Sequence, residues 1–320
     1  MRWYAAPMEG ITGWVFRQVH HRHFPGVDKY YMPFVSPGQD RCFTKRDLRE
    51  LAPEQNEGLP AVPQLLTRRA GDFLWAAGAL KEMGYQEVNL NLGCPSGTVA
   101  AKGKGAGFLA RPEELDCFLE EIFSQAPVAI SVKTRLGVEQ PEEFERLLDI
   151  FDRYPIAELT IHPRVRKDFY KNHARREWFR WALDHSTLPL CYNGDLTGAA
   201  ACRQLAEEFP QASAVMVGRG LIADPSLIGR VRGGAPLSRR QLRDFHDDLY
   251  QSYCRAFDSE RNGMLRMKEL WFYLVGLFED EDGRCAKGIR KARGPAEYLA
   301  QVEAVFCRLP LRGEAEPVWA

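Results

Sequence analysis

The sequence predicts an α/β fold, a (β/α)8 TIM barrel followed by a smaller all-helical domain. Short apolar runs alternate with longer helical patterns over about 220 residues, and parallel strands need such crossover helices. No G-x-G-x-x-G follows the first apolar run, which disfavours the competing interpretation of an open, doubly wound sheet. After Asp224 only helical periodicity remains, so we expect a helical domain there.

Each element of the barrel can be placed from its pattern of apolar residues. The expected strands are Trp3–Ala6, Lys29–Phe34, Ala61–Leu65, Glu87–Leu92, Val128–Lys133, Glu158–His162, Leu188–Asn193 and Ala214–Gly218. The helices expected between them are Phe73–Met83, Pro112–Phe123, Glu142–Tyr154, Arg176–Asp184 and Ala199–Phe209.

The segment "RGGAPLSRR" is typical of a linker. The helices expected beyond it are Arg243–Phe257, Leu265–Phe278 and Pro295–Arg308. We therefore predict a barrel domain over residues 1–233, a helical domain over 238–312 and a loosely ordered tail over 313–320.

The composition is that of a soluble globular protein, with 45% apolar and 27% charged residues. The 43 Lys and Arg residues balance 43 Asp and Glu residues, so only a local cluster could attract a polyanion. No apolar run approaches the roughly 18 residues that span a bilayer, and a signal pattern is lacking. Eight scattered cysteines without a C-x-x-C pair predict a reduced, cytoplasmic protein without structural zinc. The run "HHRHF" lacks a carboxylate at useful spacing, so no metal site is predicted, and we expect a monomer without a protein partner.

Most expected strands end in polar side chains, some of them flanked by glycine, proline or methionine. These residues are Pro7, Met8, Glu9, Gln64, Asn91, Cys94, Lys133, Arg135, His162, Arg164, Asn193, Gly194, Asp195, Gly218, Arg219 and Gly220. Functional residues of a barrel gather at the carboxyl ends of its strands. Any one of these residues alone is more often a strand-end cap, but their coincidence across at least six strands favours a functional site.

The last two expected strands end in "YNGDL" and "VGRGL". Barrels commonly bind phosphate through the backbone amides of such glycine-containing turns, and Arg219 could add a charge-assisted bond. The pattern predicts a phosphate-bearing cofactor, with simple tight turns as the alternative.

The stretch "NLNLGCPSGTVAAKGKGAGFL" places Cys94 between an apolar strand and a glycine-rich loop. A thiol at this point could fill the core, bind a metal, act as a nucleophile or donate a proton. A nucleophile needs a depressed pKa and a nearby histidine base, and the motif itself supplies no adjacent histidine.

Six motifs together resemble the tRNA-dihydrouridine synthase family. They are "APMEGITGWVFR", "NLNLGCPSGTVAAKGKGAGFL", "SVKTRLG", "TIHPRVRKDFY", "CYNGDL" and "AVMVGRGLIADP", in that order. They span residues 5 to about 225, and "LRMKELWFYLVGLF" is similar to part of the family's RNA-binding domain. The resemblance implies an FMN enzyme that reduces the C5=C6 bond of a D-loop uridine in tRNA, with NADPH restoring the flavin.

The resemblance also implies roles for individual residues. The residues that would bind FMN are Pro7, Met8, Glu9, Gln64, Lys133, His162, Asn193, Gly194, Asp195, Gly218 and Arg219. Lys133 would lie at the N1–O2 edge of the flavin, where a fixed cation stabilises the reduced anion. Hydride would pass to uracil C6 and a proton from Cys94 to C5, since a thiol with an ordinary pKa is mostly protonated at neutral pH. Asn91 would help to orient the uracil.

The loop after Cys94 differs from the family pattern in one respect. Many members have lysine directly after C-P, where this chain has "SGT", so Lys102 or Lys104 would have to replace that contact. The glycines of "KGKGAGFL" predict close backbone approach and a mobile loop that carries Cys94 onto the base.

Two basic stretches are candidates for contact with RNA. "RCAKGIRKAR" holds five basic residues, among them Arg290 and Lys291, and "HPRVRKDFYKNHARREWFR" interleaves cations with aromatic residues. A solvated helix face balanced by "EDED" is the alternative for the first. Other readings of the whole chain are an FMN barrel acting on a free pyrimidine, like dihydroorotate dehydrogenase, an aldolase-like barrel with a Lys133 Schiff base, and a non-catalytic RNA-binding protein.

Overall fold

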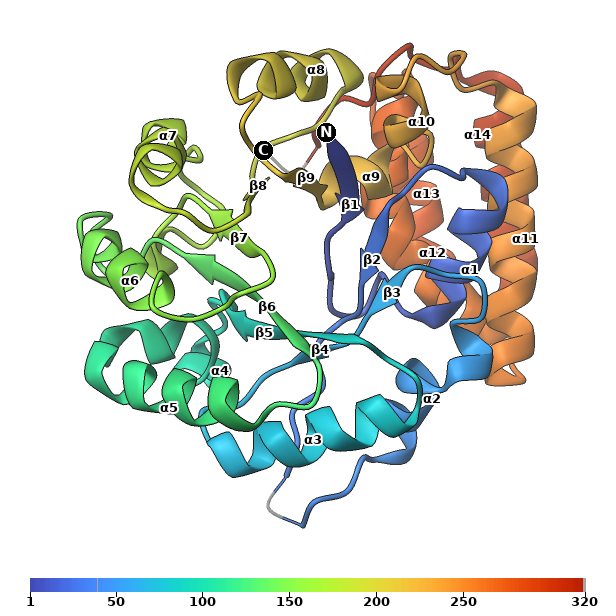
Figure 1. Ribbon diagram of the computed structural model, residues 1–320. Helices are drawn as coiled ribbons and strands as arrows, with labels where there is room; N and C mark the ends of the chain where they lie inside the picture. The colour runs from blue at the N-terminus through green and yellow to red at the C-terminus, as the bar shows by residue number, and fades with distance from the viewer. Residues whose placement is uncertain (39, 319–320) are drawn as a thin grey trace. The chain divides into compact units, whose positions relative to one another are not determined.

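The computed structural model describes residues 1–38 and 40–318. Its strands form one nine-stranded sheet in the order β3-β2-β1-β9-β8-β7-β6-β5-β4, and they pair in parallel. The strands are β1 Arg2–Ala5, β2 Lys29–Tyr31, β3 Ala61–Val62, β4 Gln64–Leu65, β5 Glu87–Leu92, β6 Ala129–Arg135, β7 Leu159–His162, β8 Leu190–Asn193 and β9 Ala214–Val217. Figure 1 shows them as a ring, which confirms the predicted barrel.

One expected strand is divided in two. Pro63 separates β3 from β4, because a proline has no backbone N–H to donate to the ladder. β3 pairs with β2 and β4 pairs with β5, so this interrupted strand joins the two ends of the strand order and closes the ring.

The helices expected between the later strands are confirmed, with ends that shift by a few residues. They are α3 Ala70–Glu82, α5 Pro112–Gln125, α6 Glu143–Phe151, α7 Arg176–His185 and α8 Ala199–Glu208. Pro112 begins α5 at a position where its missing N–H costs nothing, and two glutamates follow in the first turn, where they oppose the helix dipole. The buried face of α5 repeats at three and four residues, and Figure 1 shows α3, α5, α6 and α7 outside the ring.

The chain divides into two compact units. Unit 1 is Met1–Pro7, Asp28–Asp195 and Glu208–Met216, and unit 2 is Met8–Val27, Leu196–Glu207 and Val217–Ala320. Unit 2 thus contains Met8–Val27, Leu196–Glu207 and the start of Val217–Ala320, all of which precede residue 233. The domain boundary at residue 233 stays a prediction.

The remaining elements of unit 2 are helical. They are α1 Trp14–His23, α9 Arg219–Ala223, α10 Leu227–Val231, α11 Arg239–Phe257, α12 Glu260–Leu274, η4 Val275–Leu277, α13 Arg284–Lys291 and α14 Pro295–Arg308. Phe16 of α1 packs edge-on against Phe245 of α11, with ring centres 6.3 Å apart. The backbone N–H of Glu316 donates to the Gly276 carbonyl (2.9 Å), so part of the segment expected to be a loose tail is bound, while residues 319–320 lie outside the described part.

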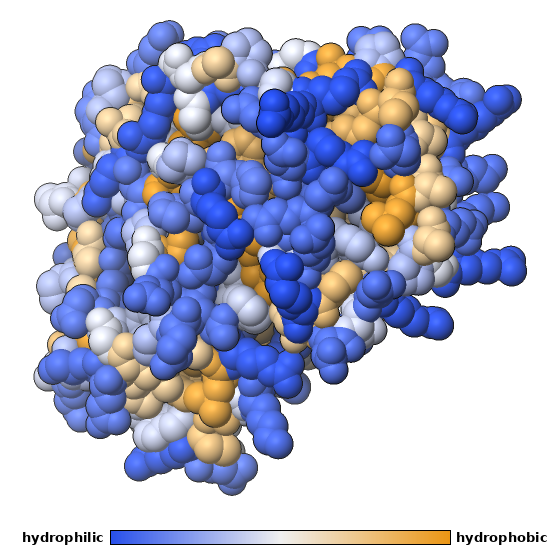
Figure 2. All heavy atoms as spheres, turned by 90° about the vertical axis from the view of Figure 1, so that its right-hand side faces the viewer, coloured by the Kyte–Doolittle hydropathy of each residue, from blue (hydrophilic) through white to orange (hydrophobic). Residues whose placement is uncertain are grey.

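Short elements complete the description of unit 1. They are α2 Lys45–Leu51, η1 Pro53–Gln55, α4 Gly97–Ala100, η2 Gly105–Ala110 and η3 Arg166–Asp168. The face of the molecule drawn in Figure 2 is largely hydrophilic, with apolar patches of limited extent. Within residues 1–38 and 40–318, no helix is both long and apolar enough to cross a membrane.

Candidate functional site

The interior of the barrel is lined by alternate residues of each strand, since successive side chains of a strand point to opposite faces. On β5 and β6 these residues are Asn91 and Lys133, which are paired in register. Lys133 is in turn paired with Thr160 of β7. The predicted site residues of unit 1 therefore lie at or near the carboxyl ends of neighbouring strands. The functional residues of a barrel are found at this end.

A chain of buried amides connects three strands at this end of the barrel. The Gln64 Nε2 donates to Asn89 Oδ1 (2.8 Å), and Asn91 Nδ2 donates to Gln64 Oε1 (2.7 Å). Asn89 Nδ2 donates onward to Ser131 Oγ (2.9 Å). A buried polar network whose members all have partners is rigid and specific, so Gln64 and Asn91 are held in single orientations.

The same network fixes the turn that carries Cys94. Asn91 Oδ1 accepts hydrogen bonds from the backbone N–H groups of Gly93 (3.1 Å) and Cys94 (3.0 Å). The Cys94 carbonyl accepts from the Ala106 N–H (3.1 Å), which ties the turn to the loop that follows. Cys94 is half-buried and is not part of a disulfide.

The glycines of this loop allow close backbone approach. Gly105 has a φ of +56°, and a Cβ there would lie 3.0 Å from both Cys94 Cβ and the Cys94 carbonyl oxygen. A Cβ on Gly107 would lie 2.6 Å from the Ala100 carbonyl oxygen. The loop is folded into α4 and η2 with Gly105 buried, and its predicted mobility stays a prediction.

Lys133 and Arg135 lie two residues apart on β6 and differ in their contacts. Within the described part of the chain, the half-buried Lys133 ammonium makes no hydrogen bond or ion pair, and burial with the nearby Arg135 charge lowers its pKa to about 8. The buried Arg135 donates to the carbonyls of Gly93 (3.0 Å), Val165 (3.0 Å) and Phe169 (2.8 Å). Arg135 therefore joins the loops after β5 and β7, and Lys133 keeps its donors available.

His162, Arg164 and Asp195 form a second connected group. The Arg164 Nη2 donates to both Asp195 carboxylate oxygens (2.8 and 2.7 Å), and the Ala174 N–H donates to one of them (2.8 Å). The Arg164 Nη1 lies 2.9 Å from His162 Nε2, which must accept because a guanidinium can only donate. Asp195 is paired with Arg164 and has a φ of +35°, and because its carboxylate is an anion, any phosphate contact would have to come from its backbone N–H.

The other predicted site residues are placed as follows. Asn193 Nδ2 donates to the Met216 carbonyl (2.9 Å), which joins β8 to β9, and Gly194 is buried beside the Tyr192 hydroxyl. Pro7 also belongs to unit 1 and is half-buried. The remaining residues belong to unit 2 and are Met8, Glu9, Gly218, Arg219, Arg290 and Lys291. Glu9 and the last two are exposed, and Gly218 immediately precedes α9, which begins at Arg219.

Comparison with known families shows which family the chain belongs to. The family model described as "Dihydrouridine synthase (Dus)" matches residues 4–264. The chain belongs to the dihydrouridine synthase family. The resemblance read from the sequence motifs is thereby confirmed.

Curated dihydrouridine synthases are similar to this chain over most of its length. The tRNA-dihydrouridine(16) synthase of Pseudomonas putida is 30% identical over 252 residues, covering 76% of this chain and 77% of that protein. A probable tRNA-dihydrouridine synthase of Rhodobacter capsulatus is 26% identical and covers 94% and 93%. The probable tRNA-dihydrouridine synthase 1 of Synechocystis is 30% identical over 71% of this chain, which spans 63% of that protein.

Solved structures share the barrel fold of this dihydrouridine synthase family member. Morphinone reductase superposes with a TM-score of 0.52 at 15% identity, over 73% of this chain and 86% of that one. Histamine dehydrogenase from Rhizobium sp. 4-9 gives a TM-score of 0.55 at 12% identity, over 77% of this chain and 46% of that one.

Sequence reasoning missed two residues of the candidate site of this family member. Asn89 and Ser131 complete the amide network by hydrogen bonds, yet both lie within strands and neither follows a strand end. Their signal is a polar residue at every second position of an apolar strand, as in "NLNL" and "ISVK". That pattern indicates a polar barrel interior, because alternate residues face inward.

Proposed function

We propose that this protein is an FMN-dependent tRNA-dihydrouridine synthase that reduces the C5=C6 bond of a D-loop uridine in tRNA, with NADPH as reductant. Membership of the dihydrouridine synthase family and the names of its curated relatives support the reaction class. The observation that carries the proposal is the register of β5 and β6, which pairs Lys133 with Asn91, the residue whose side chain fixes the turn of Cys94.

The residues of unit 1 fit a flavin at the mouth of the barrel. When bound, the flavin supplies hydride transfer between the nicotinamide and the uracil ring. Among the described residues Lys133 has no ion pair, so it offers its charge to the electron-rich edge of the ring. Gln64 is buried and bonded to Asn89 and Asn91, so it would contact the ring through the second hydrogen of Nε2. Gly194 would approach the phosphate through its backbone, and the phosphate contacts of Gly218 and Arg219 stay predictions from the sequence.

Cys94 would supply the proton that the reduced uracil needs at C5. A thiol of ordinary pKa carries its proton at neutral pH, as a general acid must. The Asn91 side-chain Oδ1 accepts one hydrogen bond from the Gly93 N–H and one from the Cys94 N–H, so the thiol is positioned from a rigid strand end. His162 Nε2 accepts from Arg164, and the His162 ring would lie beside the flavin.

The partner tRNA is supported by the charges of α13. Asp280 accepts from the backbone N–H groups of Cys285 and Ala286 at the start of this helix, and Asp282 pairs with Arg284 (3.0 Å). Among the described residues, the cations of this segment without an ion pair are Lys287, Arg290, Lys291 and Arg293. The acidic segment 279–282 therefore does not neutralise the charge of α13. Contact with RNA phosphates is the better explanation for the unpaired cations.

The second basic stretch gives less support. Most of its cations are engaged within unit 1, in the pairs Arg164–Asp195, Lys167–Glu139, Arg175–Asp168, Arg176–Glu208 and Arg180–Glu208. We assign RNA contact to α13 and propose a monomeric enzyme that works in the cytoplasm, in line with eight free cysteines.

A half-reaction experiment tests the proposed function. Cys94→Ala should bind FMN and be bleached by NADPH at the wild-type rate, and should then fail to be reoxidised by tRNA, with a loss of about 10²–10⁴-fold. The matched control is Cys117→Ala, which removes an exposed thiol of α5. A colourless protein that takes up no FMN would contradict the proposal, and a wild-type rate with tRNA would contradict the role of Cys94.

A further inference from the structure

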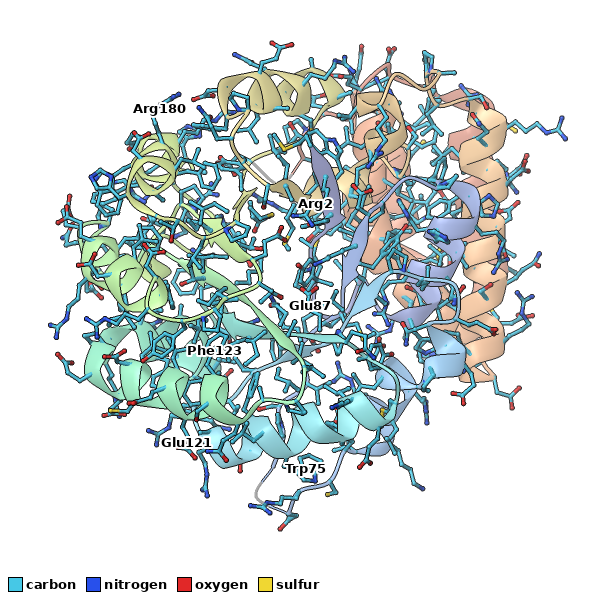
Figure 3. All side chains as sticks on the ribbon, viewed as in Figure 1. Arg2, Trp75, Glu87, Glu121, Phe123 and Arg180 are labelled. Carbon is cyan, nitrogen blue, oxygen red and sulfur yellow. The ribbon has the colours of Figure 1, made fainter. Side chains whose placement is uncertain are left out.

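The amino-terminal half of the barrel carries charges in its interior. Arg2 and Glu87 project within the ring from β1 and β5 in Figure 3, whereas Trp75, Glu121 and Arg180 lie on the outer helices. The Arg2 side chain is 51% exposed, and the Glu158 carboxylate that it binds is buried. Arg2 Nη2 pairs with Glu158 Oε2 at 2.8 Å, and Lys29 Nζ pairs with Glu87 Oε2 at 2.6 Å.

A tyrosine ring brings the two ion pairs into one cluster. The Arg2 guanidinium carbon lies 5.7 Å from the centre of the Tyr4 ring, and Lys29 Nζ lies 5.5 Å from it. The Tyr4 hydroxyl donates to Glu158 Oε2 (3.1 Å), and the Tyr31 ring centre is 5.7 Å from that of Tyr4. Both pairs and both tyrosines therefore share a small volume around the barrel axis.

Among the described residues, three buried polar atoms of this region have no hydrogen-bond partner. They are Glu87 Oε1, Glu158 Oε1 and Tyr31 Oη, and each has essentially no exposed surface. Leaving a buried polar group without a hydrogen bond is costly, and such groups in native proteins usually bind ordered water or a ligand. Three such atoms in one barrel, from β2, from β5 and from the residue before β7, call for a shared explanation.

We propose that these three atoms bind a cluster of buried water molecules in the amino-terminal half of the barrel. The two carboxylate oxygens can only accept, and the tyrosine hydroxyl can donate or accept, so molecules that do both are needed to connect them. Water does this with two to four partners in a buried site. The Tyr31 ring lies 5.7 Å from the Tyr4 ring, whose hydroxyl donates to Glu158 Oε2, so Tyr31 belongs to the same cluster. Burial, and next the charges of Glu87 and Glu158, raise the pKa of Tyr31.

A metal ion fits this region less well than water. The two carboxylates are already neutralised by Arg2 and Lys29, so an added cation would leave an uncompensated charge in the interior. In the part of the chain that is described, no group of three or more His, Cys, Asp or Glu side chains is suited to a metal ion.

The register of the strands shows how the proposed water cluster lies relative to Lys133 of the candidate site. Thr160 is paired with Lys133 on one side and with Cys191 on the other. The cluster would therefore continue the polar interior from the Arg2–Glu158 pair up to the layer that holds Lys133.

A crystal structure of the full chain, grown with rubidium in place of sodium and potassium, tests the proposal directly. We expect water density within about 3.2 Å of Tyr31 Oη and of at least one unpaired carboxylate oxygen. An interior without density, or an anomalous rubidium peak at these atoms, would overturn it.

The sign of a stability change gives an independent test. If Tyr31 Oη is bridged by water, Tyr31→Phe should raise the unfolding equilibrium constant by roughly two- to tenfold. If it has no partner, the change removes an unsatisfied group and the constant should stay or fall, which would contradict the proposal. The matched control is Tyr4→Phe, whose hydroxyl bonds Glu158 directly and whose loss should raise the constant in either case.

Discussion

At the scale of single residues, the charge of Lys133 depends on pH near neutrality. Its pKa is lowered to about 8 by burial and by Arg135, so the ammonium is present below that pH and is lost as the pH rises through it. We expect the affinity of the apoprotein for FMN to fall between pH 7 and 9, by about tenfold or more if the ammonium bonds the ring.

The variant Lys133→Met is the control for this pH dependence. Fluorescence titration with FMN should show weak binding that changes little over the same range. A wild-type affinity independent of pH would show that the Lys133 charge does not contribute to flavin binding.

Asn91 provides the second prediction for a single residue. Its side chain bonds Gln64 and two backbone N–H groups, so Asn91→Ala leaves three buried polar groups without partners. We expect the free energy of unfolding to fall by about 1–3 kcal/mol for each group that water cannot reach. Urea denaturation measures this, and an unchanged midpoint would mean that the amide network adds nothing to stability.

At the scale of elements, the loop that carries Cys94 depends on glycine at particular positions. A Cβ at Gly107 would lie 2.6 Å from the Ala100 carbonyl oxygen, whereas one at Gly97 meets nothing within 4 Å. Gly107→Ala should therefore separate η2 from α4, destabilise the protein by about 1–3 kcal/mol and slow the reaction with tRNA. Gly97→Ala is the matched control and should behave like the wild type in both urea unfolding and turnover.

Helix α13 is the element that we assign to the RNA backbone. Changing both Arg290 and Lys291 to Glu should weaken tRNA binding and reduce the slope of log K against log salt by roughly 1.5. FMN content should be unchanged. Lys81→Glu, on an exposed position of α3, is the control, and equal tRNA affinity in both variants would remove the assignment.

At the scale of the whole molecule, unit 2 gathers helices that are far apart in the sequence. Phe16 and Val19 of α1 are buried in a core that also contains Phe245 and Leu249 of α11. A fragment of residues 1–233 would expose this face of α1, and burying each such side chain contributes about 1.5–3 kcal/mol. We expect the fragment to aggregate or to bind a hydrophobic dye, and cooperative unfolding without dye binding would instead support an independent barrel domain.

Much of the barrel follows from local pattern. The strand at Glu87–Leu92 is confirmed to the residue, because apolar strands and amphipathic helices differ in period. The apolar pattern predicts one strand at residues 61–65, but Pro63 divides it into β3 and β4. The sequence did not predict α13, because Ile289 is its one buried residue and the helix has no apolar stripe. The positions of rim residues could be predicted because parallel strands all end on one side of the barrel.

The sequence by itself determined the order of strands and helices, the family, and which side chains come at the strand ends. Only the tertiary structure decided which of those side chains form hydrogen bonds or ion pairs within the protein and which remain available to bind a ligand. Asp195 is taken by Arg164, 31 residues away, while Lys133 keeps its charge unpaired. The reason is that a hydrogen bond requires atoms within about 3 Å, and that proximity comes from the packing of strands distant in the chain rather than from local periodicity.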